Sequence, residues 1–121
     1  MNLRSFDAPR RRPAPAQYRS DEGLNHPIAP RTVFIFIKSQ CDGCAAFQAG
    51  FQAAGWDAKV VAMDTDVIES PSVIRARELV QALDVRHAPF FVAVDGDPLV
   101  VVTEGVPFDP EHLRSLLSAV S

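Results

Sequence analysis

The apolar positions of this chain fall into short runs from residue 33 onward, and their lengths predict strands. Residues 33–37 are apolar throughout, which is typical of a strand buried on both faces of a sheet. Residues 58–63 form a second, mostly apolar run. Residues 90–94 and 99–103 are two further runs, separated by the turn sequence Asp-Gly-Asp-Pro, so they predict a β-hairpin.

Helical spacing separates these predicted strands. Residues 45–55 carry apolar side chains at intervals of three and four, which is the period of one helix face. Two more helices are expected to start at Ser70-Pro71 and at Asp109-Pro110, because Ser or Asp caps a helix and Pro suits its first position. The apolar stripes of these two helices are Val73, Ala76, Val80 and Leu83 in one, and Leu113, Leu116, Leu117 and Val120 in the other.

The element order is therefore β-α-β-α-β-β-α, which predicts an α/β fold. The first two connections run through helices, so we expect the first three strands to be parallel, with right-handed crossovers. The final hairpin adds an antiparallel edge. The sequence thus predicts a four-stranded mixed sheet with helices on both faces.

Composition divides the 121-residue chain into two parts. Residues 1–30 hold five of the ten prolines, and five arginines against three acidic residues, without an apolar period. Because proline breaks helices and removes sheet donors, these residues predict an extended arm or a solvated tail. Residues 31–121, with seven basic and twelve acidic residues, predict one folded domain. The arginines at residues 10–12 are a candidate contact for an acidic partner surface or for a nucleic acid.

The sequence disfavours several classes of protein. No apolar run approaches the roughly 20 residues of a membrane span, and the N-terminus lacks the apolar stretch of a secretory signal. An acidic domain is poorly suited to nucleic acid, whose phosphates require clustered Lys and Arg. Two cysteines are too few for a disulfide scaffold, so we expect a cytoplasmic protein without a membrane partner.

The two cysteines form the motif Cys41-Asp42-Gly43-Cys44, between the first predicted strand and the first predicted helix. A thiol at a helix N-terminus feels the positive end of the helix dipole, which favours the reactive thiolate. The second cysteine, one turn later, can form a disulfide with the first. The pair therefore supplies the two thiols that thiol–disulfide exchange requires.

Other interpretations of this pair stay open on the residues alone. The cysteines could form a structural disulfide or a site that has lost its activity. A zinc site is less well supported, because tetrahedral zinc needs four ligands and only His87 offers a third. An iron–sulfur cluster shared between two copies of the chain would also use this pair, although no local feature requires it. We therefore predict no metal.

Together, the motif and the element order resemble the thioredoxin/glutaredoxin superfamily over residues 31–121. Residues 85–90, Val-Arg-His-Ala-Pro-Phe, resemble that superfamily's loop before the third strand, in which the proline is cis. The resemblance implies that Pro89 is a cis-proline beside the dithiol. It also implies that Ala88 and Gly105 contact a substrate chain. Phe90, directly after the proline, is expected to line the same groove or to pack in the core.

The resemblance also implies roles around the dithiol. Cys41 would be the nucleophile, and Cys44 would be the resolving cysteine. Lys38 resembles a glutaredoxin lysine that supports the thiolate by its opposite charge, whereas Asp42 opposes the thiolate by its like charge. Gly43 stands where thioredoxins commonly have a proline.

The predicted function is that of a thiol–disulfide oxidoreductase, which uses the Cys41/Cys44 dithiol to reduce protein disulfides. It needs no bound cofactor, and a reductase or glutathione recycles it. The alternative is a structural or adaptor subunit of a larger assembly, tethered by residues 1–30. The arm distinguishes the two, because small redoxins of this superfamily seldom need a basic extension of that length.

Overall fold

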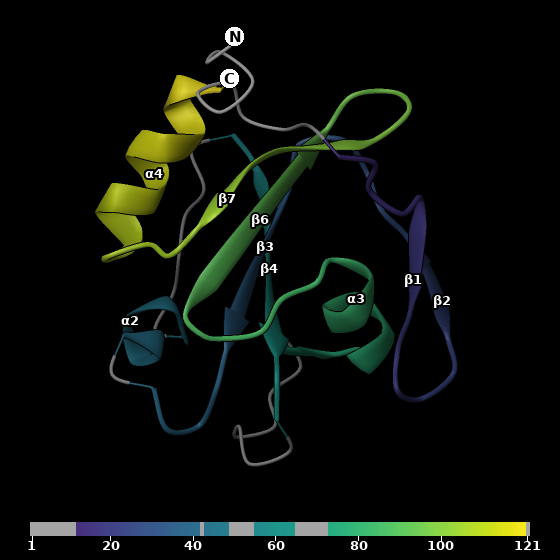
Figure 1. The fold of residues 1–121 in the computed structure, drawn as a ribbon, viewed down its shortest axis with the longest axis horizontal. Helices are drawn as coiled ribbons and strands as arrows, with labels where there is room; N and C mark the ends of the chain where they lie inside the picture. Colours follow the sequence, from purple (N-terminus) through teal and green to yellow (C-terminus); the bar gives the residue numbers. More distant parts are fainter. Residues whose placement is uncertain (1–11, 42, 49–54, 65–72, 121) are drawn as a thin grey trace, which may run out of the picture.

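The computed structural model describes residues 12–41, 43–48, 55–64 and 73–120. Its main strands are β3 (Thr32–Ile37), β4 (Asp57–Ala62), β5 (Val73–Arg75), β6 (Phe90–Asp95) and β7 (Val100–Gly105). They form one sheet in the order β5-β4-β3-β6-β7, with β3 in the centre (Figure 1). The α/β prediction is confirmed, with five strands in this sheet where four were expected.

The central strand β3 is buried along its whole length. Because side chains alternate across a strand, Val33, Ile35 and Ile37 enter one core, whereas Phe34 and Phe36 enter the other. β4 pairs with β3 in parallel on one side, and β6 pairs with it antiparallel on the other. The apolar run at residues 33–37 therefore forms the doubly buried strand that its composition predicts.

The two cores lie on opposite faces of the sheet. On one face, helices α2 (Cys44–Gln48) and α4 (Pro110–Ala119) contribute Phe47, Leu113 and Leu117. On the other face, helix α3 (Arg77–Ala82) contributes Leu79, and Leu83 follows it. Figure 1 shows α2 and α4 together on one side of the sheet and α3 on the other. The prediction of helices on both faces is confirmed.

Helix α4 begins as its sequence predicts. The Asp109 side chain accepts a hydrogen bond from the backbone N–H of His112 at 2.8 Å, and Pro110 occupies the first helical turn. A capping aspartate satisfies one of the free N–H groups of the first turn and favours the positive end of the helix dipole. Leu113 and Leu117, one turn apart, are then fully buried.

The direction of β6 differs from the prediction. The crossover rule predicts a strand parallel to β3, but β6 is antiparallel to it. Helix α3 is short, because its six residues rise about 9 Å, whereas a six-residue strand spans about 20 Å. Helix α3 alone therefore does not carry the chain back along the sheet, and residues 83–89 do not complete the return. The chain re-enters near the end of β3, where Phe90 pairs with Phe36.

The segment before α3 also differs from the prediction. Val73 was expected in a helix that starts at Ser70-Pro71, but it lies in the short edge strand β5, parallel to β4. Helix α3 starts only at Arg77, with Ala76 at its N-cap. Ser70 and Pro71 lie outside the described residues, as does the part of the first predicted helix beyond Gln48.

The described part of the arm is folded, in contrast to the expected extended arm or solvated tail. Strands β1 (Gln17–Arg19) and β2 (Asn25–Pro27) form an antiparallel hairpin beside α3 (Figure 1). Tyr18 and Ile28 are each only 6% exposed and belong to the same core as Phe34 and Leu79. Their burial explains why a proline-rich segment without an apolar period is nevertheless ordered.

Candidate functional site

The two cysteines lie between the end of β3 and the start of α2. They form a disulfide with a Cα–Cα distance of 5.4 Å, and the N–H of Cys44 donates to the carbonyl of Cys41 at 3.2 Å. Cys44, the first residue of α2, is only 2% exposed, whereas Cys41 is partly exposed. The structure is therefore the oxidised form, with one sulfur enclosed and the other nearer to solvent. Asp42 lies outside the described residues.

Lys38 contacts this site through its backbone. Its N–H donates to the Sγ atom of Cys44 at 3.5 Å. Lys38 directly follows β3, so the end of the central strand holds the enclosed sulfur. The contact shown is thus a backbone contact to Cys44, whereas the sequence points to a side-chain effect on Cys41.

Pro89 lies against the cysteine motif. The peptide bond between Ala88 and Pro89 is cis. A Cβ atom placed on Gly43 would come within 3.3 Å of the Cγ atom of Pro89, so the two residues are in direct contact. Ala88 and Cys41 are both partly buried and pack against the same core. The antiparallel direction of β6 produces this contact, because a parallel strand would start at the far end of the sheet.

Phe90 and Gly105 are both neighbours of Phe91, the first along β6 and the second across the β6–β7 ladder. Gly105 is the register partner of Phe91 in the β6–β7 ladder. A Cβ atom placed on Gly105 would lie 3.7 Å from the Cε1 atom of the Phe91 ring. Phe90 is partly buried, packs against the core on the α3 side, and contacts the His87 ring edge to face at 5.3 Å between centroids. Gly105 is thus close to the cis-proline loop across the hairpin, while Phe90 belongs largely to the core.

No protein-family model and no curated protein sequence matches this chain. Among solved structures, it is similar to the thioredoxin domain of a thiol-disulfide oxidoreductase from Bacteroides vulgatus, with 13% sequence identity. The similarity covers 90% of this chain and 95% of that chain, with a TM-score of 0.53. The fold is thioredoxin-like.

Two residues that the sequence analysis missed support the loop before the cysteines in this thioredoxin-like fold. The Ser39 hydroxyl donates to Oδ2 of Asp64 at 3.2 Å. The other oxygen, Oδ1, is buried and has no hydrogen-bond partner in the described part of the chain. Asp64 follows β4, whose parallel pairing with β3 brings the two strand ends to one edge. An aspartate two residues after such a strand is the signal that would have found it.

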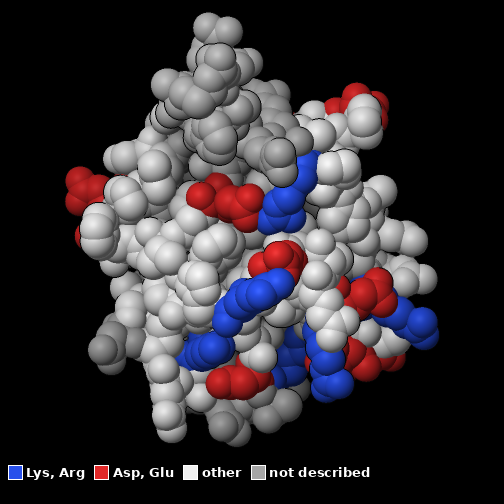
Figure 2. All heavy atoms as spheres, in the orientation of Figure 1, with Lys and Arg blue, Asp and Glu red and all other residues white. Residues whose placement is uncertain are grey.

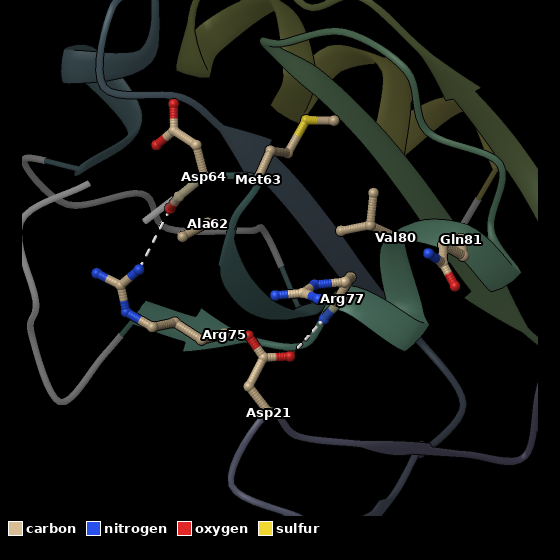
Figure 3. A pocket seen from close by; sticks show the side chains of 8 residues that line it. All are labelled: Asp21, Ala62, Met63, Asp64, Arg75, Arg77, Val80 and Gln81. Atoms are coloured by element: carbon tan, nitrogen blue, oxygen red, sulfur yellow. Dashed lines mark hydrogen bonds between the residues drawn. The ribbon is translucent and has the colours of Figure 1, made fainter. Parts of the chain in front are cut away.

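A separate pocket of about 210 Å³ lies at the same edge of the thioredoxin-like sheet, between β4, β5 and α3 (Figure 3). Arg75 donates to the backbone carbonyl of Asp64 at 3.2 Å, and the N–H of Arg77 donates to Asp21 of the arm at 2.8 Å. Its walls are Asp21, Ala62, Met63, Asp64, Arg75, Arg77, Val80 and Gln81. Neither cysteine is among the residues that line it.

The described residues contain no group of three His, Cys, Asp or Glu side chains that could hold a metal ion. His87, the candidate third ligand, contacts the Phe90 ring. On the face seen in Figure 2, basic and acidic side chains are interspersed and do not gather into a patch of one sign. Across the parts of the chain that the structure describes, no helix is long and apolar enough to cross a membrane.

Proposed function

We propose that this chain is a thiol–disulfide oxidoreductase that reduces disulfides in proteins. The observation that carries the proposal is the unequal pair of cysteines, with Cys44 enclosed and Cys41 partly exposed. A dithiol reductant needs one sulfur that a substrate can reach and a second that only the first can reach. In this proposal an incoming chain lies against Pro89, which contacts the motif at Gly43.

The proposed reaction has two exchange steps. The Cys41 thiolate attacks one sulfur of the substrate disulfide, which forms a mixed disulfide and releases the other substrate sulfur as a thiolate. The Cys44 thiolate then attacks the Cys41 sulfur, which releases the second substrate thiolate. Two electrons pass to the substrate, and the chain is left with the Cys41–Cys44 disulfide of the present structure.

The surrounding residues receive supporting roles in this proposal. Lys38 fixes the Cys44 sulfur through its N–H, and its positive charge favours thiolate in the motif. Gly43 permits the close approach of Pro89. Ala88, Pro89 and Gly105 contact the backbone of the substrate chain, and the exposed part of Phe90 borders that contact.

The oxidised chain must be reduced before a second turnover, so a reductase or glutathione is the expected electron donor. The similarity to a domain of a thiol-disulfide oxidoreductase supports the same class of reaction. The two thiols alone carry both electrons, so the proposed reaction requires no bound cofactor.

Single cysteine variants test this proposal. The full chain, prepared in its reduced form, is mixed with a disulfide-bonded protein, and released thiols are measured. Cys41→Ser should abolish the release of thiols. Cys44→Ser should accumulate a mixed disulfide with the substrate, which an added reductant cleaves. Normal reduction by Cys41→Ser would refute the assignment of the nucleophile.

The alternative of a tethered assembly subunit is tested with a short truncation. Tyr18 and Ile28 lie in the core of the domain, so removing residues 1–30 would expose apolar surface and destabilise the fold. Removing residues 1–11 leaves both side chains in place. A tether in those residues predicts that this truncation releases a partner, whereas the redox proposal predicts unchanged disulfide reduction.

A further inference from the structure

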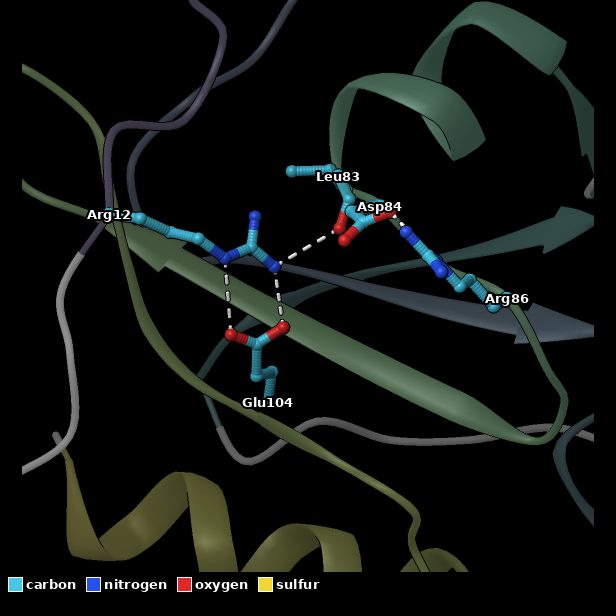
Figure 4. A network of polar contacts seen from close by, with 5 residues as sticks. All are labelled: Arg12, Leu83, Asp84, Arg86 and Glu104. Carbon is cyan, nitrogen blue, oxygen red and sulfur yellow. Dashed lines mark hydrogen bonds and ion pairs between the residues drawn. The ribbon is translucent and has the colours of Figure 1, made fainter. Parts of the chain in front are cut away.

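Arg12 of the arm joins two separate segments of the domain (Figure 4). Its Nε atom donates to Oε2 of Glu104 at 3.2 Å, and its Nη2 atom donates to Oε1 of Glu104 at 2.5 Å. The same Nη2 atom also donates to the backbone carbonyl of Leu83 at 3.1 Å. One guanidinium thus makes a two-pronged contact with a carboxylate and a third contact with a main chain.

The backbone of Arg12 is held at the same time. The N–H of Val101 donates to the carbonyl of Arg12 at 2.9 Å, and the N–H of Ala14 donates to the carbonyl of Leu99 at 3.0 Å. These two bonds lay the arm antiparallel along the start of β7, with Pro13 opposite Val100. Because these bonds already fix the main chain, the contacts of the Arg12 guanidinium cost only the freedom of the side chain.

The two partners of Arg12, Leu83 and Glu104, lie next to the segments that are proposed to contact the substrate. Leu83 follows α3 and begins the loop that ends in Ala88 and Pro89. Glu104 directly precedes Gly105, which pairs with Phe91 across the hairpin. Arg12 therefore lies where the cis-proline loop and the end of β7 are both anchored.

We propose that Arg12 is a positioning residue for the substrate-contacting segments, because it holds the start of the loop of residues 83–89 against the end of β7. The proposal rests on the proposed function, in which a substrate chain contacts Ala88, Pro89 and Gly105, and it adds the residue that keeps those contacts in place. A small disulfide that touches only Cys41 does not need this arrangement.

The chemistry of the contact favours arginine at this position. The planar guanidinium matches both oxygens of a carboxylate and has a further N–H for the Leu83 carbonyl. A lysine offers a single charged point and cannot make the same three contacts at once. The side chains of Arg12 and Glu104 are 30% and 33% exposed, so solvent screens this pair less than a pair on the open surface.

The same loop contains a matched control. Arg86 pairs with Asp84 at 3.1 Å, but these side chains are 80% and 70% exposed. An ion pair so open to water contributes little. Arg86→Met removes an arginine from the loop itself, whereas Arg12→Met removes one that holds the loop from outside.

The test compares Arg12→Met, Arg12→Lys and Arg86→Met in the full chain, with a peptide disulfide and with a small aromatic disulfide as substrates. Arg12→Met should raise KM for the peptide about tenfold, because displaced contacts align the substrate poorly. Its rate with the small disulfide and its Cys41 alkylation rate should stay unchanged. Arg12→Lys should lie between Arg12→Met and wild type, and Arg86→Met should change KM less than about twofold.

Hydrogen exchange at the backbone amides of residues 84–88 is measured in parallel, since it requires no activity. Faster exchange in Arg12→Met, but not in Arg86→Met, shows that Arg12 holds this loop, whether or not wild type reduces disulfides. Failure of wild type to reduce disulfides would refute the proposed function, and with it the role of this loop towards a substrate. An unchanged peptide KM together with unchanged exchange overturns the positioning role. A parallel loss with both substrates also overturns it, because that pattern indicates general destabilisation.

Discussion

The backbone N–H of Lys38 donates to the sulfur of Cys44 at 3.5 Å. This contact links the residue after the central strand to the first residue of α2. Cys44, at the start of α2, is 2% exposed, whereas Cys41, three residues earlier, is partly exposed. Two cysteines with the same chemistry therefore occupy different environments, which is the physical basis for assigning them different roles.

The contact between Gly43 and Pro89 predicts the effect of adding one methyl group. A Cβ at residue 43 would lie 3.3 Å from the Cγ of Pro89, so the proline must move by a few tenths of an ångström. Gly43→Ala should therefore lower kcat/KM for a peptide disulfide by about tenfold. Gly43→Val, which has a larger side chain, should lower it further. Steady-state kinetics measures both, and wild-type values for both variants would contradict the proposed role of this contact.

The hydrogen bond between Ser39 and Asp64 predicts a coupling between β4 and the loop before the cysteines. Ser39→Ala, Asp64→Ala and the double variant form a cycle whose coupling free energy should be about 0.5–1.5 kcal/mol. Asp64→Ala should cost less than Ser39→Ala, because it also removes a buried carboxylate oxygen that lacks a partner among the described residues. Urea denaturation of the oxidised protein gives these values. A coupling energy of zero would show that the bond does not form in solution.

Burial raises the pKa of Tyr18 above its ordinary value, which predicts a loss of stability in alkali. Below about pH 10 the phenol is protonated in both the folded and the unfolded chain. Above that pH the unfolded chain ionises first, so the free energy of unfolding falls as the pH rises through the folded pKa.

The matched control for this prediction is Tyr18→Phe, which keeps a ring against Phe34 and His26 but cannot ionise. Urea denaturation of the oxidised protein up to about pH 11 should show a steeper loss of stability in wild type than in this variant. Since the chain has one tyrosine, phenolate absorbance reports this group directly. Equal pH dependence in both proteins would mean that Tyr18 is not buried.

The strands and the last helix could be predicted because their local signals agree with their final environments. Residues 33–37 are apolar on both faces, and β3 is buried on both faces. Asp109 and Pro110 form a helix start of the usual kind, and α4 begins there. In these elements, the local sequence pattern favours the same structure as the packing in the folded chain.

The direction of β6 could not be predicted from the connection rule, because that rule assumes a helix long enough to span the sheet. The short α3 reverses the chain, and this reversal brings Pro89 to Gly43 and the cysteines. The family resemblance placed Pro89 beside the dithiol without this geometry. The connection rule places Pro89 at the far end of the sheet from the cysteines, whereas the resemblance places it beside them. The antiparallel pairing of β6 with β3 agrees with the resemblance.

The order in the arm and the contacts of Arg12 also could not be read from the sequence. Tyr18 and Ile28 are single apolar residues in a polar, proline-rich segment, and only the core beneath them reveals their role. Arg12 belongs to a run of three arginines, and nothing local distinguishes it from its neighbours. Its partner Glu104 is 92 residues away, so the contact exists only in the folded chain.

The central claim is that Cys41 is a poised nucleophile and Cys44 a sheltered partner. The most direct test reduces the full-length protein, alkylates it briefly near neutral pH with a small reagent, and measures modification of each cysteine by mass spectrometry. We expect Cys41 to react at least about tenfold faster than Cys44, because only an accessible thiolate reacts readily. Equal and slow modification of both residues, or faster modification of Cys44, would contradict the account.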